Sequence, residues 1–138
     1  MIASAKERRQ EPTPHPPPVG SLARRLRSLG LPQIAALDAR LKGARHGTLV
    51  DDRLHQSVPI LRFRIQPWRG PFDEPGAVPG SVLEFAVEET PRQVVARYWL
   101  DPLATAPAHQ QRIDGEDLAR PWVERVLVDF VDKALHRA

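Results

Sequence analysis

Alternating hydrophobic and polar residues mark out strands in the middle of the chain. In the segment 58–66 every second residue from position 61 is apolar, and the segment 81–88 alternates in the same way. The segment 93–100 is apolar at both parities. A period of two is typical of a half-buried strand, and apolar residues at both parities indicate a strand covered on both faces. We predict three antiparallel strands, with a short fourth strand allowed at Thr48–Val50.

The strongest helical pattern lies near the end of the chain. Apolar residues recur there at every fourth position, which places them on one face of a helix. Acidic residues precede the pattern, where the helix dipole favours them, and Pro121 suits a first turn. The apolar stripe is wider than a small sheet needs, so this helix is either deeply buried or in contact with a second copy. The recurring residues are Leu118, Trp122, Val126, Phe130 and Ala134.

Two short amphipathic helices are predicted before the first strand. Ser21 is a suitable N-cap, and Gly30 is a suitable end for the first helix. Pro32 is tolerated in the first turn of the second helix, which should end at Gly43. This order of elements predicts an α+β fold. In it, a three-stranded antiparallel sheet packs against a long C-terminal helix and short N-terminal helices as a two-layer sandwich.

Proline dominates the beginning of the chain. Five of the seven residues from Pro12 to Pro18 are proline, which removes backbone donors and disfavours a helix. We expect residues 1–20 to form a disordered Pro-rich arm and residues 21–138 to form a single α+β domain. The PxxP spacing in the arm is also typical of ligands for aromatic-lined grooves, which is the alternative interpretation of this segment.

Composition narrows the classes of function. None of the 138 residues is cysteine, which excludes disulfides, thiolate nucleophiles and cysteine-ligated zinc. No stretch approaches the roughly 18 consecutive apolar residues that span a bilayer, and the first residues lack an apolar run of signal-peptide length. Arginine, alanine and proline are abundant, as in a GC-rich genome. We therefore expect a bacterial, cytoplasmic protein that does not act at a membrane.

Charge is distributed unevenly along the chain. The net charge is +3, but residues 1–45 carry nine basic and three acidic side chains, whereas the remainder is mildly acidic. A basic segment neutralises phosphates without reading sequence, and such binding weakens as salt rises. One alternative function is therefore a nucleic-acid-associated protein that uses its basic N-terminal region. Its candidate residues are Arg8, Arg9, Arg24, Arg25 and Arg27.

The sequence contains no recognisable catalytic motif. It has no nucleophile elbow, no phosphate-binding loop and no HExxH zinc motif. The one local cluster of metal-ligand types is His46, Asp51, Asp52 and His55, which could hold a divalent cation or transfer protons. A small enzyme or metal-binding protein with a site near His46–His55 is the second alternative, although an ordinary polar loop explains the same residues. We assign no catalytic or metal-ligating residue and expect no cofactor.

Aromatic residues indicate a protein-binding surface instead. Trp68 and Phe72 lie in a loop rich in proline and glycine, and aromatic side chains are enriched at interfaces. Trp99 and the apolar stripe of the final helix offer further area, unless these side chains only complete the core. We predict a non-enzymatic binding or adaptor protein that acts through protein–protein contacts and forms a homodimer. The candidate interaction residues are Trp68, Phe72, Trp99, Trp122 and Phe130, and the identity of the partner is unknown.

Overall fold

Two α-helices and five strands make up the described part of the fold. The computed structural model describes residues 21–68, 80–101 and 103–136. The predicted arm 1–20, with Arg8 and Arg9, and the loop residue Phe72 lie outside these ranges. The elements in chain order are α1 (Leu22–Gly43), β1 (Gly47–Arg53), β2 (Ile60–Gln66), β3 (Ser81–Glu89), β4 (Arg92–Trp99), β5 (His109–Asp114), the 3-10 helix η2 (Gly115–Asp117) and α2 (Arg120–Leu135).

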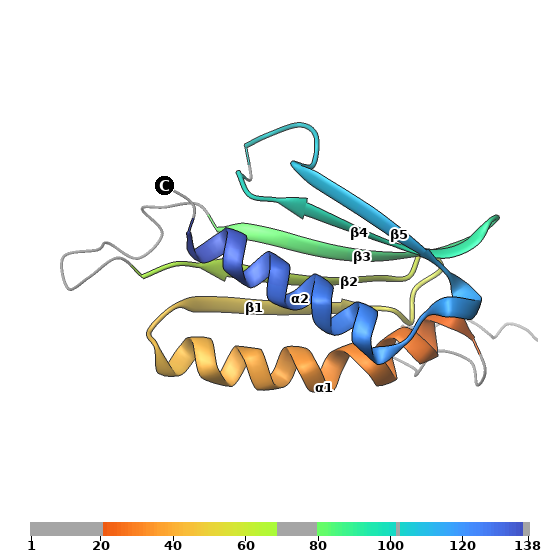
Figure 1. Ribbon diagram of the computed structural model, residues 1–138, viewed down its shortest axis with the longest axis horizontal. Helices are drawn as coiled ribbons and strands as arrows, with labels where there is room; N and C mark the ends of the chain where they lie inside the picture. Colours follow the sequence, from red (N-terminus) through yellow and green to blue (C-terminus); the bar gives the residue numbers. More distant parts are fainter. Residues whose placement is uncertain (1–20, 69–79, 102, 137–138) are drawn as a thin grey trace, which may run out of the picture.

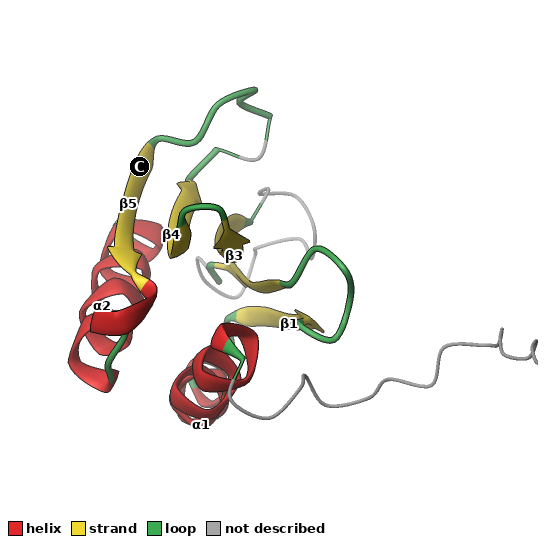
Figure 2. Cartoon of the chain, turned by 90° about the vertical axis from the view of Figure 1, so that its right-hand side faces the viewer, coloured by secondary structure: helices red, strands yellow, loops and turns green. Residues whose placement is uncertain are grey.

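The strands form one antiparallel sheet in which each strand pairs with its neighbours in sequence. The order across the sheet is β1-β2-β3-β4-β5. Both helices lie on the same side of this sheet (Figure 1), and the end-on view shows the sheet curving around them (Figure 2). The predicted α+β class is confirmed, with a larger sheet than expected. The other face of the sheet carries no helix among the described residues.

An aromatic cluster joins α2 to the middle of the sheet. Phe63 pairs with Leu83 and Leu83 pairs with Tyr98, so these three residues lie side by side on the face below the helices. The ring of Phe130 in α2 packs edge-on against Phe63 at 6.3 Å and against Tyr98 at 5.6 Å between centroids. The whole predicted stripe is buried, as expected for a helix that covers a core, although its first residue, Leu118, lies just before α2.

One continuous helix replaces the two short N-terminal helices. The predicted cap is confirmed, because the Ser21 side chain accepts a hydrogen bond from the third residue after it, and the predicted end at Gly43 is confirmed as well. The predicted break at Gly30 and Pro32 is wrong, because both residues lie inside α1. A Cβ at Gly30 would lie 3.5 Å from a β2 side chain and 4.0 Å from an α2 side chain. Gly30 therefore marks a close approach between elements, and packing on both sides of Pro32 keeps the helix intact.

The sheet has two strands more than the three that alternation predicts. The fourth strand allowed at Thr48–Val50 is real, and it extends over the seven residues of β1. The fifth strand, β5, occupies 109–114, where no strand was predicted. Its sequence HQQRID contains one apolar residue, Ile113, so it shows no period-two pattern. Backbone pairing with β4 makes it a strand, and alternation cannot reveal a pairing of that kind.

The Tyr98 hydroxyl is hydrogen-bonded where α2 crosses β4 and β5. It donates to the Val126 carbonyl oxygen at 3.2 Å and accepts from Gln111 Nε2 at 3.1 Å. Burial raises the pKa of Tyr98, and the nearby Asp129 carboxylate raises it further. The hydroxyl therefore stays protonated and acts as a fixed link between the helix and the sheet.

The acid stability of the fold should depend on Asp129. A hydrogen bond from Lys133 at 2.8 Å lowers the pKa of Asp129 from its ordinary value of 3.8, although partial burial opposes the shift. Since the pKa is lower in the folded chain, the ionised group contributes stability that is present above the unfolded pKa and is lost as the pH falls through the folded pKa. We expect the free energy of unfolding of Asp129→Asn to fall less steeply than that of the wild type as the pH is lowered from about 5 to about 2. Urea titrations at a series of pH values measure this difference.

Glu116→Gln is the control for that experiment, since Glu116 is an exposed carboxylate of η2. Its stability should follow the wild-type dependence on pH. An Asp129→Asn profile with the wild-type slope would contradict the role given to the carboxylate.

Candidate protein-binding surface

The sheet face opposite the helices, which we call the open face, is organised in rows that cross the strands. Since Phe63, Leu83 and Tyr98 face the helices, their sequence neighbours point to the open face. The antiparallel registers align one such row at the end of the sheet from which the segment 69–79 departs. We call it the tryptophan row: Leu49 of β1, Arg64 of β2, Val82 of β3 and Trp99 of β4.

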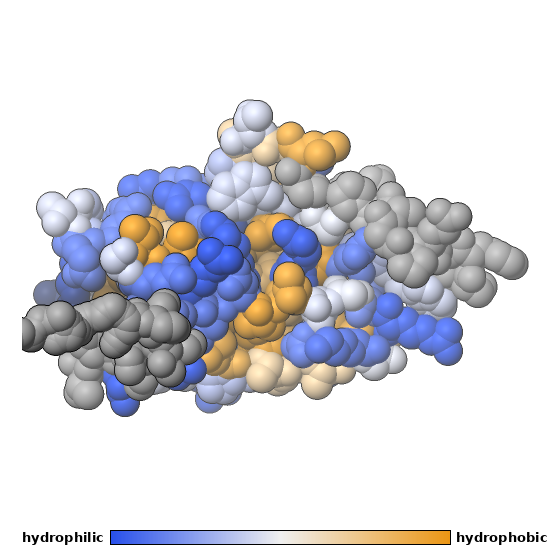
Figure 3. Space-filling model, turned by 180° about the vertical axis from the view of Figure 1, so that it is seen from behind, coloured by the Kyte–Doolittle hydropathy of each residue, from blue (hydrophilic) through white to orange (hydrophobic). Residues whose placement is uncertain are grey.

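The tryptophan row offers apolar surface to solvent. Leu49 is 57% exposed, Arg64 is exposed, and Val82 and Trp99 are partly buried. Seen from behind, the molecule has hydrophobic surface set among hydrophilic side chains (Figure 3). Large apolar side chains that gather on one face indicate a contact site, whereas singly scattered ones need no explanation.

The next row of the open face is an ion-pair network. Glu84 is only 8% exposed and lies between two arginines. Arg62 Nε is 3.0 Å from its Oε1, and Arg97 Nη1 is 3.3 Å from its Oε2. Arg97 also lies 3.7 Å from Glu88 and donates to Gln110 at 3.2 Å. These charges satisfy one another, so this row gives a partner little electrostatic attraction and forms a polar border beside the tryptophan row.

A third row, on the far side of the ion pairs, is mostly buried at its middle. Its middle consists of Ile60, Ala86 and Val95, which the registers place side by side. Val95 is fully buried and Ala86 is 8% exposed. Ala86 and Val95 are therefore already removed from water, whereas Ile60 is partly buried. The strongly exposed apolar side chain of these rows is Leu49, which lies in the tryptophan row.

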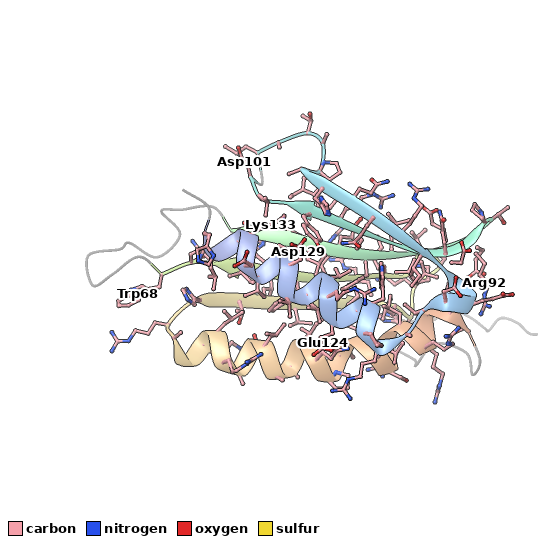
Figure 4. All side chains as sticks on the ribbon, viewed as in Figure 1. Trp68, Arg92, Asp101, Glu124, Asp129 and Lys133 are labelled. Carbon is pink, nitrogen blue, oxygen red and sulfur yellow. The ribbon has the colours of Figure 1, made fainter. Side chains whose placement is uncertain are left out.

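Trp68 is held at the same end of the molecule by the C-terminus of α1. Arg45 has a positive φ of 71°, which turns the chain sharply after the helix, and its guanidinium lies 5.2 Å from the centre of the Trp68 ring. The Trp68 backbone N–H donates to His46 Nδ1 at 2.9 Å. Figure 4 shows Trp68 beyond the end of β2, beside the turn that follows α1. A cation–π contact of this kind fixes an aromatic ring while leaving part of it accessible.

The other two predicted aromatic contacts pack within the chain. Phe130 is fully buried, and Trp122 is buried with its ring 6.1 Å from Phe85. The structure thus brings Trp68 and Trp99 to one end of the sheet and keeps Trp122 and Phe130 in the core. Leu49 and Val82 were not singled out from the sequence, although Val82 is an apolar residue at a parity that should face solvent.

Two of the predicted phosphate-binding arginines are paired with other residues of the chain. Arg25 donates through Nη1 to the Gly115 carbonyl and through Nη2 to the Leu118 carbonyl, both at 2.7 Å. Arg27 Nε forms an ion pair with Asp52 at 3.0 Å. Arg24 is exposed and beside them on α1. The guanidinium groups of Arg25 and Arg27 thus stabilise contacts of α1, which leaves less positive charge on α1 for a nucleic acid.

The predicted histidine cluster is divided by a strand. His46 precedes β1 and His55 follows it, so the seven residues of the strand separate them by roughly 20 Å at about 3.3 Å per residue. Asp51 and Asp52 point to opposite faces, and each is ion-paired with an arginine. Over the ranges that the structure covers, no group of three or more histidine and carboxylate side chains could hold a metal ion.

Comparisons with known proteins gave no match. No protein-family model matches the chain, and neither does any curated protein or solved structure. Of the helices described, none combines the length and the apolar character that crossing a membrane requires.

Proposed function

We propose that this chain is a non-enzymatic binding or adaptor protein that contacts its protein partner through the tryptophan row. The observation that carries this proposal is the cross-strand alignment of Leu49, Val82 and Trp99 on a sheet face that none of the described helices covers. Tryptophan is enriched among the residues that dominate binding energy at interfaces. The strands hold the backbone of these residues in fixed positions, so little backbone freedom is lost when a partner binds.

The charges of the row indicate the chemistry of the partner. Arg64 stands between Leu49 and Val82 and is exposed, and its guanidinium forms no hydrogen bond or ion pair with any other described residue. A guanidinium in this setting favours a carboxylate, with which it forms charge-assisted hydrogen bonds. The fitting partner is a protein segment that presents apolar side chains on both sides of an aspartate or glutamate.

A displayed peptide library selected on the full chain tests this proposal. The selected peptides should combine apolar residues with a carboxylate, and their affinities should be measured by calorimetry on the wild type and on variants. Trp99→Ala is expected to weaken binding by about 30-fold or more, as for the central residue of an interface. Arg64→Glu should weaken it by at least about 10-fold, because it places like charges together.

Arg53→Glu is the matched control. Arg53 is also an exposed arginine on the open face, but it belongs to the row of Val95. The variant should change the affinity less than about 2-fold, since a distant surface charge has little effect. Circular dichroism on Trp99→Ala separates loss of binding from loss of folding. Selected peptides that bind Trp99→Ala and Arg64→Glu as tightly as the wild type would refute the proposal.

A further inference from the structure

We propose that β5 and the outer side of α2 together bind a second copy of this chain about a two-fold axis. β5 is the last strand of the sheet and pairs only with β4 among the described strands. The backbone groups on its outer side are therefore open to pairing with another strand. β5 contains no proline and carries only one arginine, Arg112, and one aspartate, Asp114. This inference is independent of the tryptophan row, which lies on a different surface.

A groove lies between β5 and α2. It has a volume of about 700 Å³, and α2 runs beside β5 at this edge of the molecule (Figure 2). Val128 stands on its helical side and is 59% exposed, which makes it the apolar centre of an otherwise charged stripe. The residues that line the groove are Gln111 of β5 and Glu124, Arg125, Val128, Asp129 and Asp132 of α2.

Residues of opposite charge on α2 face each other when two copies of the helix pack antiparallel. A two-fold axis at Val128 sets two α2 helices antiparallel, so residues one turn before Val128 face residues one turn after it in the second copy. Arg125 then faces Asp132 of the second copy, and both residues line the groove. This contact occurs twice because of the symmetry.

The sequence of β5 favours one register of pairing with β5 of the second copy, and this register is compatible with the two-fold axis at Val128. Residues paired across an antiparallel sheet point to the same face, so a strand that pairs with its own copy is centred on a residue. A centre at Arg112 would bring two arginines together, which is unfavourable. A centre at Gln111 brings two amides together and sets Gln110 opposite Arg112. Since Gln111 and Val128 line one groove, a single axis can pass through both centres.

The structure of such a dimer has a consequence for binding. The two sheets become one continuous sheet, and the open faces of the two copies lie on the same side of it. A partner with two suitable segments would then meet two tryptophan rows, which raises its apparent affinity when both segments can bind together.

Sedimentation equilibrium on the full chain tests the inference. The wild type should sediment with twice the mass of one chain, and Val128→Glu should raise the dissociation constant of the dimer by at least about 10-fold, because two carboxylates meet at the axis. Val58→Glu is the matched control, since Val58 is an exposed valine away from β5 and α2, 64% exposed against 59% for Val128. It should leave the dissociation constant within about 2-fold of the wild type.

A charge exchange gives a second, more specific measurement. Arg125→Glu and Asp132→Arg should each weaken the dimer, and the double variant should restore its affinity to within about 3-fold of the wild type, as expected when two charges face each other across an interface. Misfolding in a single variant would not be repaired by a second charge reversal.

Several results would overturn the inference. They are a monomeric wild type, a Val128→Glu variant that dimerises as tightly as the wild type, or a double variant no better than the single ones. A monomer whose groove takes up an extended peptide would also overturn it. Peptide binding at the tryptophan row is expected to survive in Val128→Glu, and dimerisation is expected to survive in Arg64→Glu. Failure of one proposal is therefore distinguishable from failure of the other.

Discussion

Phe130→Ala is expected to lower the free energy of unfolding by about 3–5 kcal/mol, the range for removing a buried phenylalanine ring. Phe130 is fully buried and contacts the rings of Phe63 and Tyr98. Its removal leaves a cavity at the centre of the contact between α2 and the sheet, which these rigid strands cannot fill. Urea unfolding followed by circular dichroism measures the loss.

Leu103→Ala provides the comparison for Phe130→Ala. Leu103 is a large apolar residue that is 82% exposed, and its truncation should change stability by no more than about 0.5 kcal/mol. A loss below about 1 kcal/mol for Phe130→Ala would mean that α2 does not pack on the sheet as described, because a cavity the size of a phenylalanine ring lowers the free energy of unfolding by more than this.

Arg25→Ala is expected to destabilise the fold by about 2 kcal/mol, because a charged donor to two carbonyl oxygens is lost. Its guanidinium ties α1 to Gly115 and Leu118 through two bonds of 2.7 Å. Without them, two partly buried carbonyl oxygens lose their donor. The same urea titration measures this effect.

Arg27→Ala is the control for Arg25→Ala, because it removes an arginine from α1 without removing hydrogen bonds to the two carbonyl oxygens. Its ion pair with Asp52 has side chains that are 45% and 27% exposed, and a surface pair of this kind contributes at most about 1 kcal/mol. Equal destabilisation by Arg25→Ala and Arg27→Ala would show that the two carbonyl contacts do not hold α1 in place.

The predictable part of the fold is the part in which burial leaves a periodic pattern. In β2 and β3, every second side chain enters the core, so alternation located both strands. Residues of α2 such as Val126 and Phe130 recur at helical spacing because one face of the helix covers the sheet. β5 was missed because an end strand with one solvent-facing side needs few apolar residues. α1 was predicted as two short helices because the local preferences of glycine and proline take no account of packing.

The candidate surface was predictable only in part. Aromatic content drew attention to Trp68 and Trp99, which lie at the same end of the sheet. It drew equal attention to Trp122 and Phe130, which are buried. Composition cannot separate the two pairs, because a core and an interface use the same side chains. Leu49 could not be connected with Trp99, since strand registers are long-range pairings.

By itself, the sequence determined the fold class, the final helix, the central strands and the lack of cysteine chemistry, because each depends on residue type and local period. The tertiary structure decided how far the sheet extends, which arginines of α1 are engaged, and which tryptophans stay accessible. Those outcomes depend on contacts between residues far apart in the chain, such as Arg25 with Leu118 and Val82 with Trp99. Local periodicity carries no information about contacts of that kind.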